Sequence, residues 1–454
     1  MDIGIIGGGI SSLMCAYSLS KNMNNKITIF EKGKSLDNRK CPLLAKEIDK
    51  CAKCKTCAIM EGLAGAGAFS DGKYNITDEF GGWLKDFIGS QAVIDYENKA
   101  IEILESFGAQ TGRYRPDNEL KKLCMQNNLN MLQSECIHLG TDANYITMKN
   151  MVNSMPSNVS IKTGCNVVDV YNFNNKKRIE FINNSLNKED FDIIIFAVGR
   201  SGSSFLSDWC NRNSIKLINN QVDIGVRVEL PALIWEDFEQ KIYEPKILYR
   251  TKQYGDLVRM FCFNGRGEVV TENTNGVLSV NGHAYKAEEK KTNNTNFALL
   301  STIKFTQPFN QPIDYARSIA NITNMIGGGS VLVQRLGDLE AGRRSDESRI
   351  NKGTVKPTLS SAVPGDLSLC IPKRQLDNII ETLHALDKVA PGTANPDTLL
   401  YGLECKYYSA RPVVNEHFEI QDNVFAIGDG AGFTRSLAQA AAQGLYIADY
   451  INNK

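Results

Sequence analysis

The sequence of 454 residues lacks both a long hydrophobic run and an excess of charge of either sign. A membrane-spanning helix needs at least about 18 consecutive apolar residues, and no stretch of the chain approaches that length. The 51 basic and 51 acidic residues cancel, which gives no support to a polyanion-binding protein. A Ser/His/Asp hydrolase motif and a phosphate P-loop are also missing. We therefore expect a cytoplasmic protein with no membrane contact, and the charge balance does not favour a nucleic-acid partner.

The N-terminal segment joins two apolar runs through a glycine-rich turn. Residues 2–6 and 26–31 read as buried strands, and residues 7–12 as a turn that leads into a helix. This order matches the dinucleotide-binding pattern G-x-G-x-x-G, with Ser12 at the third glycine. Gly7 permits the tight turn, and Gly9 lets the backbone approach a pyrophosphate at the start of the helix. Glu31 is placed to accept hydrogen bonds from an adenosine ribose. The cofactor-binding residues predicted here are Gly7, Gly9, Ile10, Ser11, Ser12, Glu31 and Lys32.

A second strand–turn–helix pattern, NVFAIGDGAGFTRSLAQAAAQG, lies close to the C-terminus. Gly428 and Asp429 end the strand, a glycine turn follows, and we expect a helix over 434–445, with Ala438 near the cofactor. A carboxylate beside such a turn suits a ribityl hydroxyl. The helix N-terminus would face the pyrimidine edge of a flavin, where negative charge appears on reduction. The first motif alone fits NAD and FAD equally, but the pair favours FAD. The alternative is an ordinary β-α unit that ends a domain.

A third segment, FDIIIFAVGRSG at 191–202, is typical of a buried strand after which the chain turns away from the sheet. Ala197 and Gly199, at this turn, are further predicted cofactor-binding residues. Together the three segments resemble the glutathione-reductase type of flavoprotein. Further motifs are GLAGAGAFSDGKYN, HLGTD, VDIGVRVE, VQRLGDLEAGRRS, PGDLS and DTLLYGLECKYYSARPV. With these motifs nearly the whole chain resembles the bacterial NAD(P)/FAD-dependent oxidoreductases known as uncharacterised FAD-dependent dehydrogenases. The resemblance implies FAD and a two-part fold, and it implies no particular substrate.

The predicted fold class is α/β. We expect a Rossmann-like FAD-binding domain built from both chain ends, with an inserted mixed β/α substrate domain between them. A strand-rich pattern after Asp223 places the FAD-binding parts at 1–215 and 395–454 and the insert at 216–394. A chain of this length is expected to divide into domains. IGGGS at 326–330 follows a predicted helix and reads as a helix stop, so a second nucleotide-binding domain is not visible. The electron donor stays open between NAD(P)H, a carrier such as a ferredoxin-like protein, and the substrate itself.

Four of the 12 cysteines cluster in a charged loop at 34–60, with the spacing C-x9-C-x2-C-x2-C. The last three resemble the first ligands of a 4Fe–4S run, and four thiolates also suit tetrahedral zinc. Free thiols or a redox pair are the third alternative. An iron–sulfur cluster beside the flavin could relay single electrons, whereas zinc would only hold the loop. The residues concerned are Cys41, Cys51, Cys54 and Cys57.

Polar residues among small ones at 62–73 are predicted to lie near the cofactor. Lys73 is a catalytic candidate near flavin N5 or the substrate, and the alternative is a loop in which Asp71 caps a turn and Lys73 is solvated. Arg39 is predicted to neutralise the pyrophosphate, with a surface charge as the equal alternative. The remaining predicted contacts are Gly67, Ser70, Asp71 and Gly72.

Further catalytic candidates come from three later segments. Arg343 and Arg344 follow a glycine and could clamp a carboxylate or phosphate, or else form ion pairs with nearby acidic residues. Lys406 and Tyr407 precede the C-terminal motif, and a tyrosine could donate a proton after hydride transfer. Because strand neighbours face opposite sides, at most one of Tyr407 and Tyr408 is expected to reach the flavin. His138 lies in HLGTD, where a packed or surface histidine is the alternative.

These features predict an FAD-dependent oxidoreductase that transfers hydride between flavin N5 and a small-molecule substrate held between the two domains. One alternative is a flavoprotein that modifies a nucleobase in RNA, which the zero net charge does not support. The other is an FAD protein without turnover, in which the cysteine cluster acts as a redox or metal switch.

Overall fold

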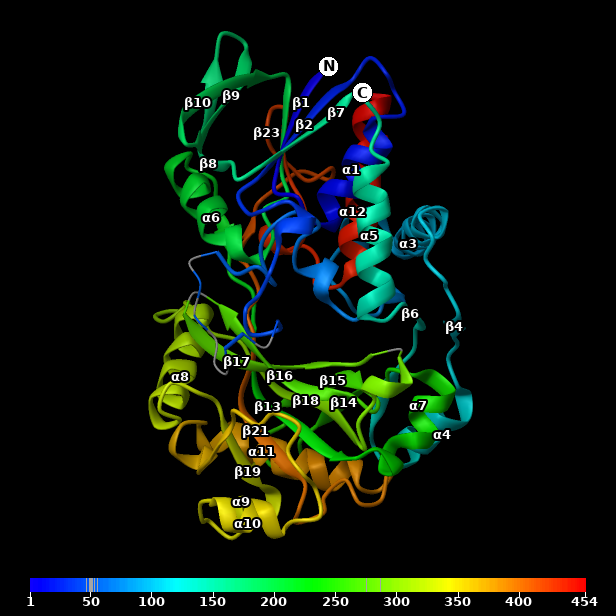
Figure 1. The fold of residues 1–454 in the computed structure, drawn as a ribbon, viewed down its shortest axis with the longest axis vertical. Coiled ribbons are helices and arrows are strands. Elements are labelled where there is room, and N and C mark those ends of the chain that lie inside the picture. Colours follow the sequence, from blue (N-terminus) through cyan, green and yellow to red (C-terminus); the bar gives the residue numbers. More distant parts are fainter. Residues whose placement is uncertain (46, 49–51, 53, 55, 275, 286) are drawn as a thin grey trace.

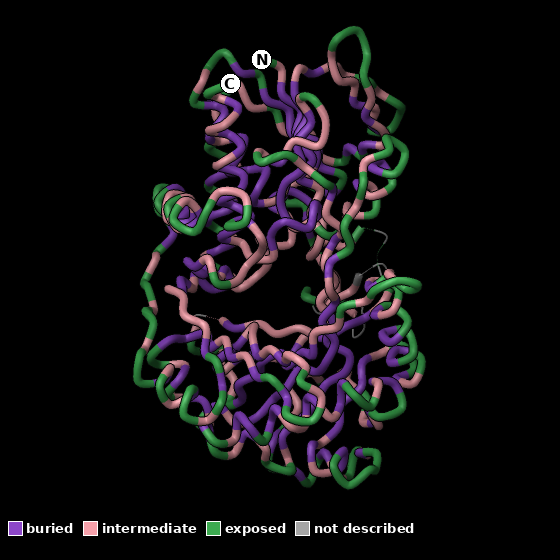
Figure 2. Tube along the Cα trace, turned by 180° about the vertical axis from the view of Figure 1, so that it is seen from behind, coloured by how far each residue is buried: buried purple, intermediate pink, exposed green. Residues whose placement is uncertain are grey.

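The computed structural model describes every residue except 46, 49–51, 53, 55, 275 and 286. Two large sheets divide the molecule along its long axis, and both chain ends lie beside the six-stranded sheet, away from the eight-stranded one (Figure 1). Figure 2 shows the buried segments gathered in two regions, one around each sheet. Among the described helices, none has the length and apolar composition needed to cross a bilayer.

The six-stranded sheet has the order β23-β24-β11-β1-β2-β7. All neighbours pair in parallel except β23 with β24. Its central strands are nearly continuous apolar runs, as is typical of a parallel sheet covered on both faces. The bounds are β1 Asp2–Ile6, β2 Lys26–Glu31, β7 Val159–Thr163, β11 Ile193–Phe196, β23 Glu419–Gln421 and β24 Val424–Ala426.

Helices cover one face of this sheet and a small antiparallel sheet covers the other. Helix α1 (Ile10–Leu19) packs against α12 (Leu437–Asn453), and α3 (Ser90–Ser106) packs on α12. Gly444 permits the close approach of α1 and α12, because a Cβ there would lie 2.2 Å from the carbonyl oxygen of Ser11. On the other face, Phe30 of β2 contacts Phe181 and Phe191 of the sheet formed by β8 (Asn166–Phe173), β9 (Lys176–Asn183) and β10 (Ser185–Phe191).

The eight-stranded sheet has the order β20-β19-β21-β13-β18-β15-β14-β5 and is antiparallel except between β19 and β20. Helices α11 (Lys373–Leu386) and α8 (Pro312–Ile326) pack against it. Helix α8 ends at Ile326, directly before the glycines that predicted a helix stop. The strands are β5 Asn130–Leu132, β13 Val222–Pro231, β14 Lys246–Arg250, β15 Leu257–Asn264, β18 Asn294–Ile303, β19 Leu332–Arg335, β20 Val363–Pro364 and β21 Leu399–Lys406.

Shorter elements connect the two parts. The small sheets are β3-β6-β4 (Lys73–Ile76, Glu135–His138, Arg113–Tyr114), β16-β17 (Glu268–Thr274, Val277–His283) and β12-β22 (Leu217–Ile218, Arg411–Pro412). The remaining helices are α2 Lys85–Ile88, α4 Asn118–Gln126, α5 Thr141–Asn153, α6 Ser203–Arg212, α7 Glu236–Ile242, α9 Leu336–Glu340 and α10 Glu347–Lys352.

The predicted α/β fold class is confirmed, because the N-terminal strands lie in a mostly parallel sheet that is covered by helices on one face. Sheet membership differs from the expected boundaries at 215 and 395, however. Strand β5, from the first FAD-binding part, and β21, from the second, both lie in the eight-stranded sheet. The apolar pattern at 399–406 indicates a buried strand but carries no information on which strands it pairs with. Here the partners are β13 and β19.

Candidate functional site

One cavity of about 1130 Å³ lies between the two sheets. Three of its lining segments directly follow β1, β11 and β24, at the carboxyl ends of parallel strands, where α/β sheets bind ligands. Its opposite wall includes side chains of β15 and residues 406–409, which comprise the last residue of β21 and the three that follow it. Both chain ends and the eight-stranded sheet therefore contribute to a single site.

In the turn after β1, glycine is needed at Gly7 and at Gly9 for different reasons. Gly7 has φ +103°, and a Cβ there would lie 2.2 Å from the carbonyl oxygen of Ala197. Gly9 has φ −79°, which any residue adopts, but a Cβ there would meet no described atom within 4 Å because the position faces the cavity. Helix α1 begins at Ile10, so its first turn points at this space. Ser11 lines the cavity, whereas Ser12 is fully buried in the helix and does not.

Glu31 ends β2 at the cavity wall with its carboxylate held in place. Its two oxygens accept hydrogen bonds from the backbone N–H groups of Gly8 and Gly33, each at 2.8 Å. Each carboxylate oxygen can accept further bonds, so the side chain keeps the capacity predicted for a ribose. Lys32, also in the lining, pairs with Glu61 at 2.6 Å. The open space at Gly9 and the acceptor at Glu31 fit the adenosine diphosphate half of FAD.

Arg39 does not reach the cavity, and its predicted role at the pyrophosphate is not supported by its contacts. The buried guanidinium donates hydrogen bonds to backbone carbonyls at 58–65, including those of Leu63 and Gly65 at 2.7 Å, and it lies over the Phe69 ring. Burial lowers its pKa to about 10, although Glu31 and other nearby groups oppose the shift. Arg39 therefore holds the glycine-rich loop in shape instead of contacting a phosphate.

The 66–73 segment lines the cavity through Gly67, Ser70, Asp71 and Lys73. Lys73 forms an ion pair with Asp71 at 2.9 Å and donates to the side chain of Asn264 at 3.0 Å. Burial alone would lower the pKa of Lys73, but Asp71 and Glu244 outweigh it and raise the pKa above its usual value. The alternative of a solvated Lys73 is therefore wrong, because only 8% of the side chain is exposed. Gly72 lies behind the lining, against Asn144.

His138 lies one strand away from the cavity. Its backbone pairs with Lys73 across β3 and β6, and its Nε2 is 3.0 Å from the Tyr243 hydroxyl, with the two rings stacked. It is not part of the cavity lining. The structure thus supports the packed-histidine alternative over direct catalysis.

Arg343 and Arg344 lie away from the cavity, between α9 and α10. Arg343 pairs with the buried Asp338 at 2.9 Å, and Arg344 is exposed. The ion-pair alternative therefore describes Arg343, and the structure does not bring either arginine to the predicted site.

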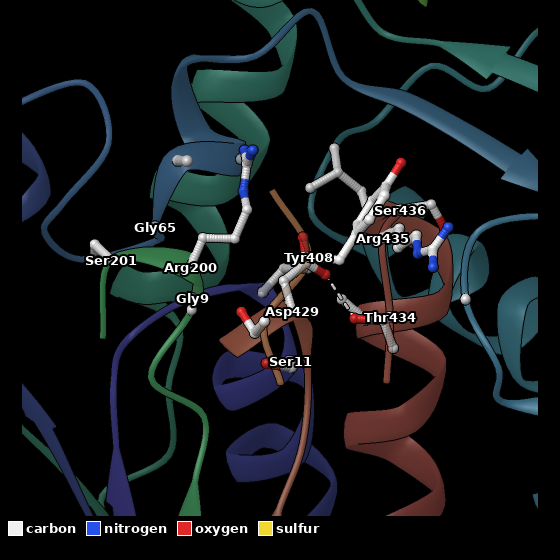
Figure 3. Close-up of a pocket in the computed structure, with 18 of the residues that line it drawn as sticks. Gly9, Ser11, Gly65, Arg200, Ser201, Tyr408, Asp429, Thr434, Arg435 and Ser436 are labelled. Carbon is white, nitrogen blue, oxygen red and sulfur yellow. Dashed lines mark hydrogen bonds between the residues drawn. The ribbon is translucent and has the colours of Figure 1, made fainter. Parts of the chain in front are cut away.

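The C-terminal motif forms the other side of the cavity. Asp429 is half-buried and accepts a hydrogen bond from the Thr434 hydroxyl at 2.6 Å. Burial raises its pKa, although Arg200 and Thr434 oppose the shift. Gly428 has φ +77°, and its N–H donates to Gln443 at 2.7 Å. Figure 3 shows Asp429 between Arg200 on one side of the cavity and Thr434 on the other.

Helix α12 begins at Leu437, three residues later than predicted, because Ser436 is its N-cap and accepts from the Gln439 N–H at 3.1 Å. Residues 434–436 form the turn before it and line the cavity. Ala438 is fully buried and does not line the cavity. Ala197 and Gly199, after β11, do line it, with φ +60° at Gly199.

Both Tyr407 and Tyr408 line the cavity, and the expectation that at most one of them reaches the flavin stays a prediction. Strand β21 ends at Lys406, and the alternation of strand side chains therefore does not apply to the residues that follow. Lys406 also lines the cavity and lies 3.2 Å from the buried Glu404. Burial lowers the pKa of Lys406, but Glu404 and Glu272 outweigh this and raise it.

Sequence analysis missed a polar cluster at the cavity wall, built around an aspartate that lies behind the lining residues. Asp223 is fully buried and accepts hydrogen bonds from Tyr408 and Arg259. Arg435 lies between two aromatic rings, with its guanidinium carbon 3.7 Å from the Tyr408 ring centre and 3.8 Å from that of Trp83. The sequence signal was their position, because Asp223 is the second residue of the VDIGVRVE motif and Arg435 lies two residues before α12.

The predicted metal ligands are only partly described. Cys41 and Cys57 are half-buried and Cys54 is exposed, whereas Cys51 lies outside the described residues. Within the described part of the chain, no group of three or more His, Cys, Asp or Glu side chains is placed to hold a metal ion. The 4Fe–4S or zinc site thus stays a prediction based on spacing.

Comparisons with known proteins agree with this geometry. Residues 221–407 match the family described as FAD-dependent protein, C-terminal domain-like, and residues 5–36 match the NAD(P)-binding Rossmann-like domain. A protein of Clostridium beijerinckii, named as an uncharacterized protein, is 24% identical over 482 residues, which cover 99% of this chain and 80% of the relative.

Two solved structures give alignments that extend over the whole chain, with low TM-scores. Pyridoxine 4-oxidase from Mesorbium loti gives a TM-score of 0.44 at 12% identity and covers 100% of this chain and 99% of that one. Glycine oxidase from Geobacillus kaustophilus gives a TM-score of 0.43 at 13% identity, with 100% and 95% covered. The two family matches agree with the predicted family resemblance: residues 221–407 are similar to the C-terminal domain of FAD-dependent proteins, and residues 5–36 are similar to a Rossmann-like dinucleotide-binding domain.

Proposed function

We propose that this chain binds FAD in the cavity between the sheets and uses it to transfer hydride to or from a small molecule held against β15 and residues 406–409. The observation that supports this most strongly is the continuity of the site. One cavity reaches from the glycine turn after β1 to the polar wall of the eight-stranded sheet. A cofactor bound at the turn would therefore share its space with a second ligand.

The residues that would hold FAD come from both chain ends. The open backbone at Gly9 and the first turn of α1 suit the pyrophosphate, and Glu31 suits the adenosine ribose. Asp429 suits a ribityl hydroxyl, and the turn before α12 suits the flavin ring. When bound, FAD supplies the hydride-transfer chemistry itself.

The side chains on the substrate side divide into proton donors and fixed cations. Burial raises the pKa of Tyr407 and of Tyr408 well above its usual value, so both hydroxyls keep their protons at neutral pH. Lys73 and Lys406 keep their charge because carboxylates lie beside them. We therefore assign proton donation to Tyr407, and we assign Lys406 to the orientation of a polar substrate.

Rapid mixing of the anaerobic, FAD-loaded protein with electron donors tests the proposal. The donors are NADH, NADPH and reduced ferredoxin, followed by absorbance at the flavin bands, with free FAD as the control. Donor oxidation faster than with free FAD supports the proposal. Bound FAD that all three donors leave oxidised, combined with a large change of shape on adding metal or oxidant, would favour the switch alternative instead. Binding of RNA that weakens steeply with salt would favour the nucleobase alternative.

For the cysteine loop we propose either an iron–sulfur cluster, which would relay single electrons to the flavin, or a zinc ion, which would only hold the loop. The support is the spacing of four cysteines just before the loop that lines the cavity. A ferredoxin-like donor and a cytoplasmic location belong to the same proposal.

A further inference from the structure

Arg435 carries its charge in the cavity without an ionic partner among the described residues. Its guanidinium lies between the rings of Trp83 and Tyr408, and its Nε and Nη2 atoms are buried and have no hydrogen-bond partner there. Burial, together with the nearby Arg259, lowers the pKa of Arg435 to about 10, although Tyr408 and Asp223 oppose the shift. Buried guanidinium donors are normally paired, so this position calls for an acceptor that the described side chains do not supply.

Arg259 approaches the same tyrosine from the other sheet. It extends from β15, pairs with the buried Asp223, and lies 3.4 Å from the Tyr408 hydroxyl. Its Nε is also buried without a described partner. Two guanidinium groups therefore meet at Tyr408, and Asp223, the carboxylate bonded to both Arg259 and Tyr408, offsets only one of the two charges.

We infer that Arg435 and Arg259 bind the carboxylate of the substrate, so that this oxidoreductase acts on a small organic acid. This inference rests on the proposed function and names the substrate class of the same cavity. A carboxylate is planar and accepts two parallel hydrogen bonds, which matches the donor pattern of a guanidinium. The rings of Trp83 and Tyr408 on either side of Arg435 fix the guanidinium plane, and they also favour a flat ligand.

A second source of negative charge is the reduced flavin, because Arg435 lies just before α12, which the proposed function places at the flavin ring. Arg259 decides between the two sources. It belongs to the eight-stranded sheet, which carries no part of the dinucleotide motif, and it has its own open donor. The pair is therefore assigned to a ligand that touches both sheets.

Calorimetric titration of the oxidised, FAD-loaded protein with benzoate tests the assignment, with benzamide as the uncharged control ligand. We expect benzoate to bind at least about 10-fold more tightly than benzamide, because a charged pair is lost in the amide. Arg435→Met should weaken benzoate binding at least about 10-fold, and Arg435→Lys should restore part of it. Arg259→Lys, which keeps a cation beside Asp223, should also weaken it.

Arg411→Met is the matched control variant. Arg411 also lies over the Trp83 ring, at 4.4 Å, but does not line the cavity. Its loss should leave benzoate affinity within about 2-fold of wild type. Thermal unfolding checks that each variant is folded.

Three results would overturn the assignment. The first is FAD-loaded wild-type protein that does not prefer benzoate, and the second is equal loss of affinity in Arg411→Met and Arg435→Met. The third is a lowered flavin reduction potential in Arg435→Met with benzoate affinity unchanged, which would assign the arginine to the reduced flavin. A protein that binds no FAD would refute the proposed function as well, so the two failures differ in the flavin spectrum.

Discussion

Replacement of Gly9 by valine tests the cofactor site with little disturbance of the fold. Gly9 has φ −79° and ψ −176°, an extended conformation that valine adopts, and its Cβ would meet no described atom within 4 Å. A gain of about 0.4–1 kcal/mol from restricting the unfolded chain opposes the loss of a glycine N-cap, which is worth a similar amount. The free energy of unfolding of the apoprotein should therefore stay within about 1 kcal/mol of wild type.

FAD binding should respond very differently, because the added side chain would occupy the space that we assign to the pyrophosphate. Overpacking of this kind costs about 1–3 kcal/mol, which corresponds to a Kd about 5- to 150-fold weaker. Fluorescence titration of apoprotein with FAD measures the change, and urea unfolding measures stability. Gly112→Val is the matched control, since Gly112 also has open space at its Cβ but lies in an exposed loop outside the cavity. A folded Gly9→Val protein with wild-type FAD affinity would refute the reasoning.

Three further predictions concern stability and metal content. Burial raises the pKa of Glu97 to about 9 in the folded protein, whereas the pKa of an unfolded glutamate is about 4.3. Between these two pH values the folded protein holds a proton that the unfolded chain has lost, so the free energy of unfolding falls by up to about 1.4 kcal/mol for each pH unit of increase. Urea unfolding at pH 5.5 and 8 should show that Glu97→Gln removes this pH dependence. Glu102→Gln, at an exposed position on the same helix, is the control and should retain it. The same pH dependence in both variants would contradict the prediction. Arg39→Met should lower the free energy of unfolding by about 2–4 kcal/mol by leaving buried carbonyls unpaired, and a loss no larger than in exposed Arg115→Met would count against its assigned role. Metal analysis of protein purified without oxygen should find about four irons or one zinc per chain, reduced in Cys54→Ala, and a chain without either would end the metal proposal.

The parts of the site that sequence predicted are those in which local geometry determines the residue. Gly7 must have positive φ at a tight turn beside Ala197, and this constraint is visible in a strand–glycine–helix pattern. Glu31 ends the adjacent parallel strand at a fixed distance along the chain. Its position follows from the two strands and needs no knowledge of the rest of the fold.

Other parts depend on contacts between distant segments. Asp223, Arg259 and Tyr408 are up to 185 residues apart in the sequence. They come together because β13 pairs with β21 and β18, and β18 in turn pairs with β15. The sequence does not tell whether Arg39 contacts a phosphate or a loop. Its contacts depend on the position of the backbone carbonyls of residues 58–65, which accept its hydrogen bonds in the structure. In the sequence, Arg343 and Arg344 could equally have formed a clamp for a ligand. In the structure, α9 places the buried carboxylate of Asp338 beside Arg343.

The most direct test of the account is the FAD content of the purified chain. The visible spectrum should show the two flavin absorption bands, and denaturation should release about one FAD per chain, with apoprotein regaining the bands when FAD is added back. Protein that carries no flavin and gains none on titration with FAD would contradict the assignment of the cavity and of the proposed function.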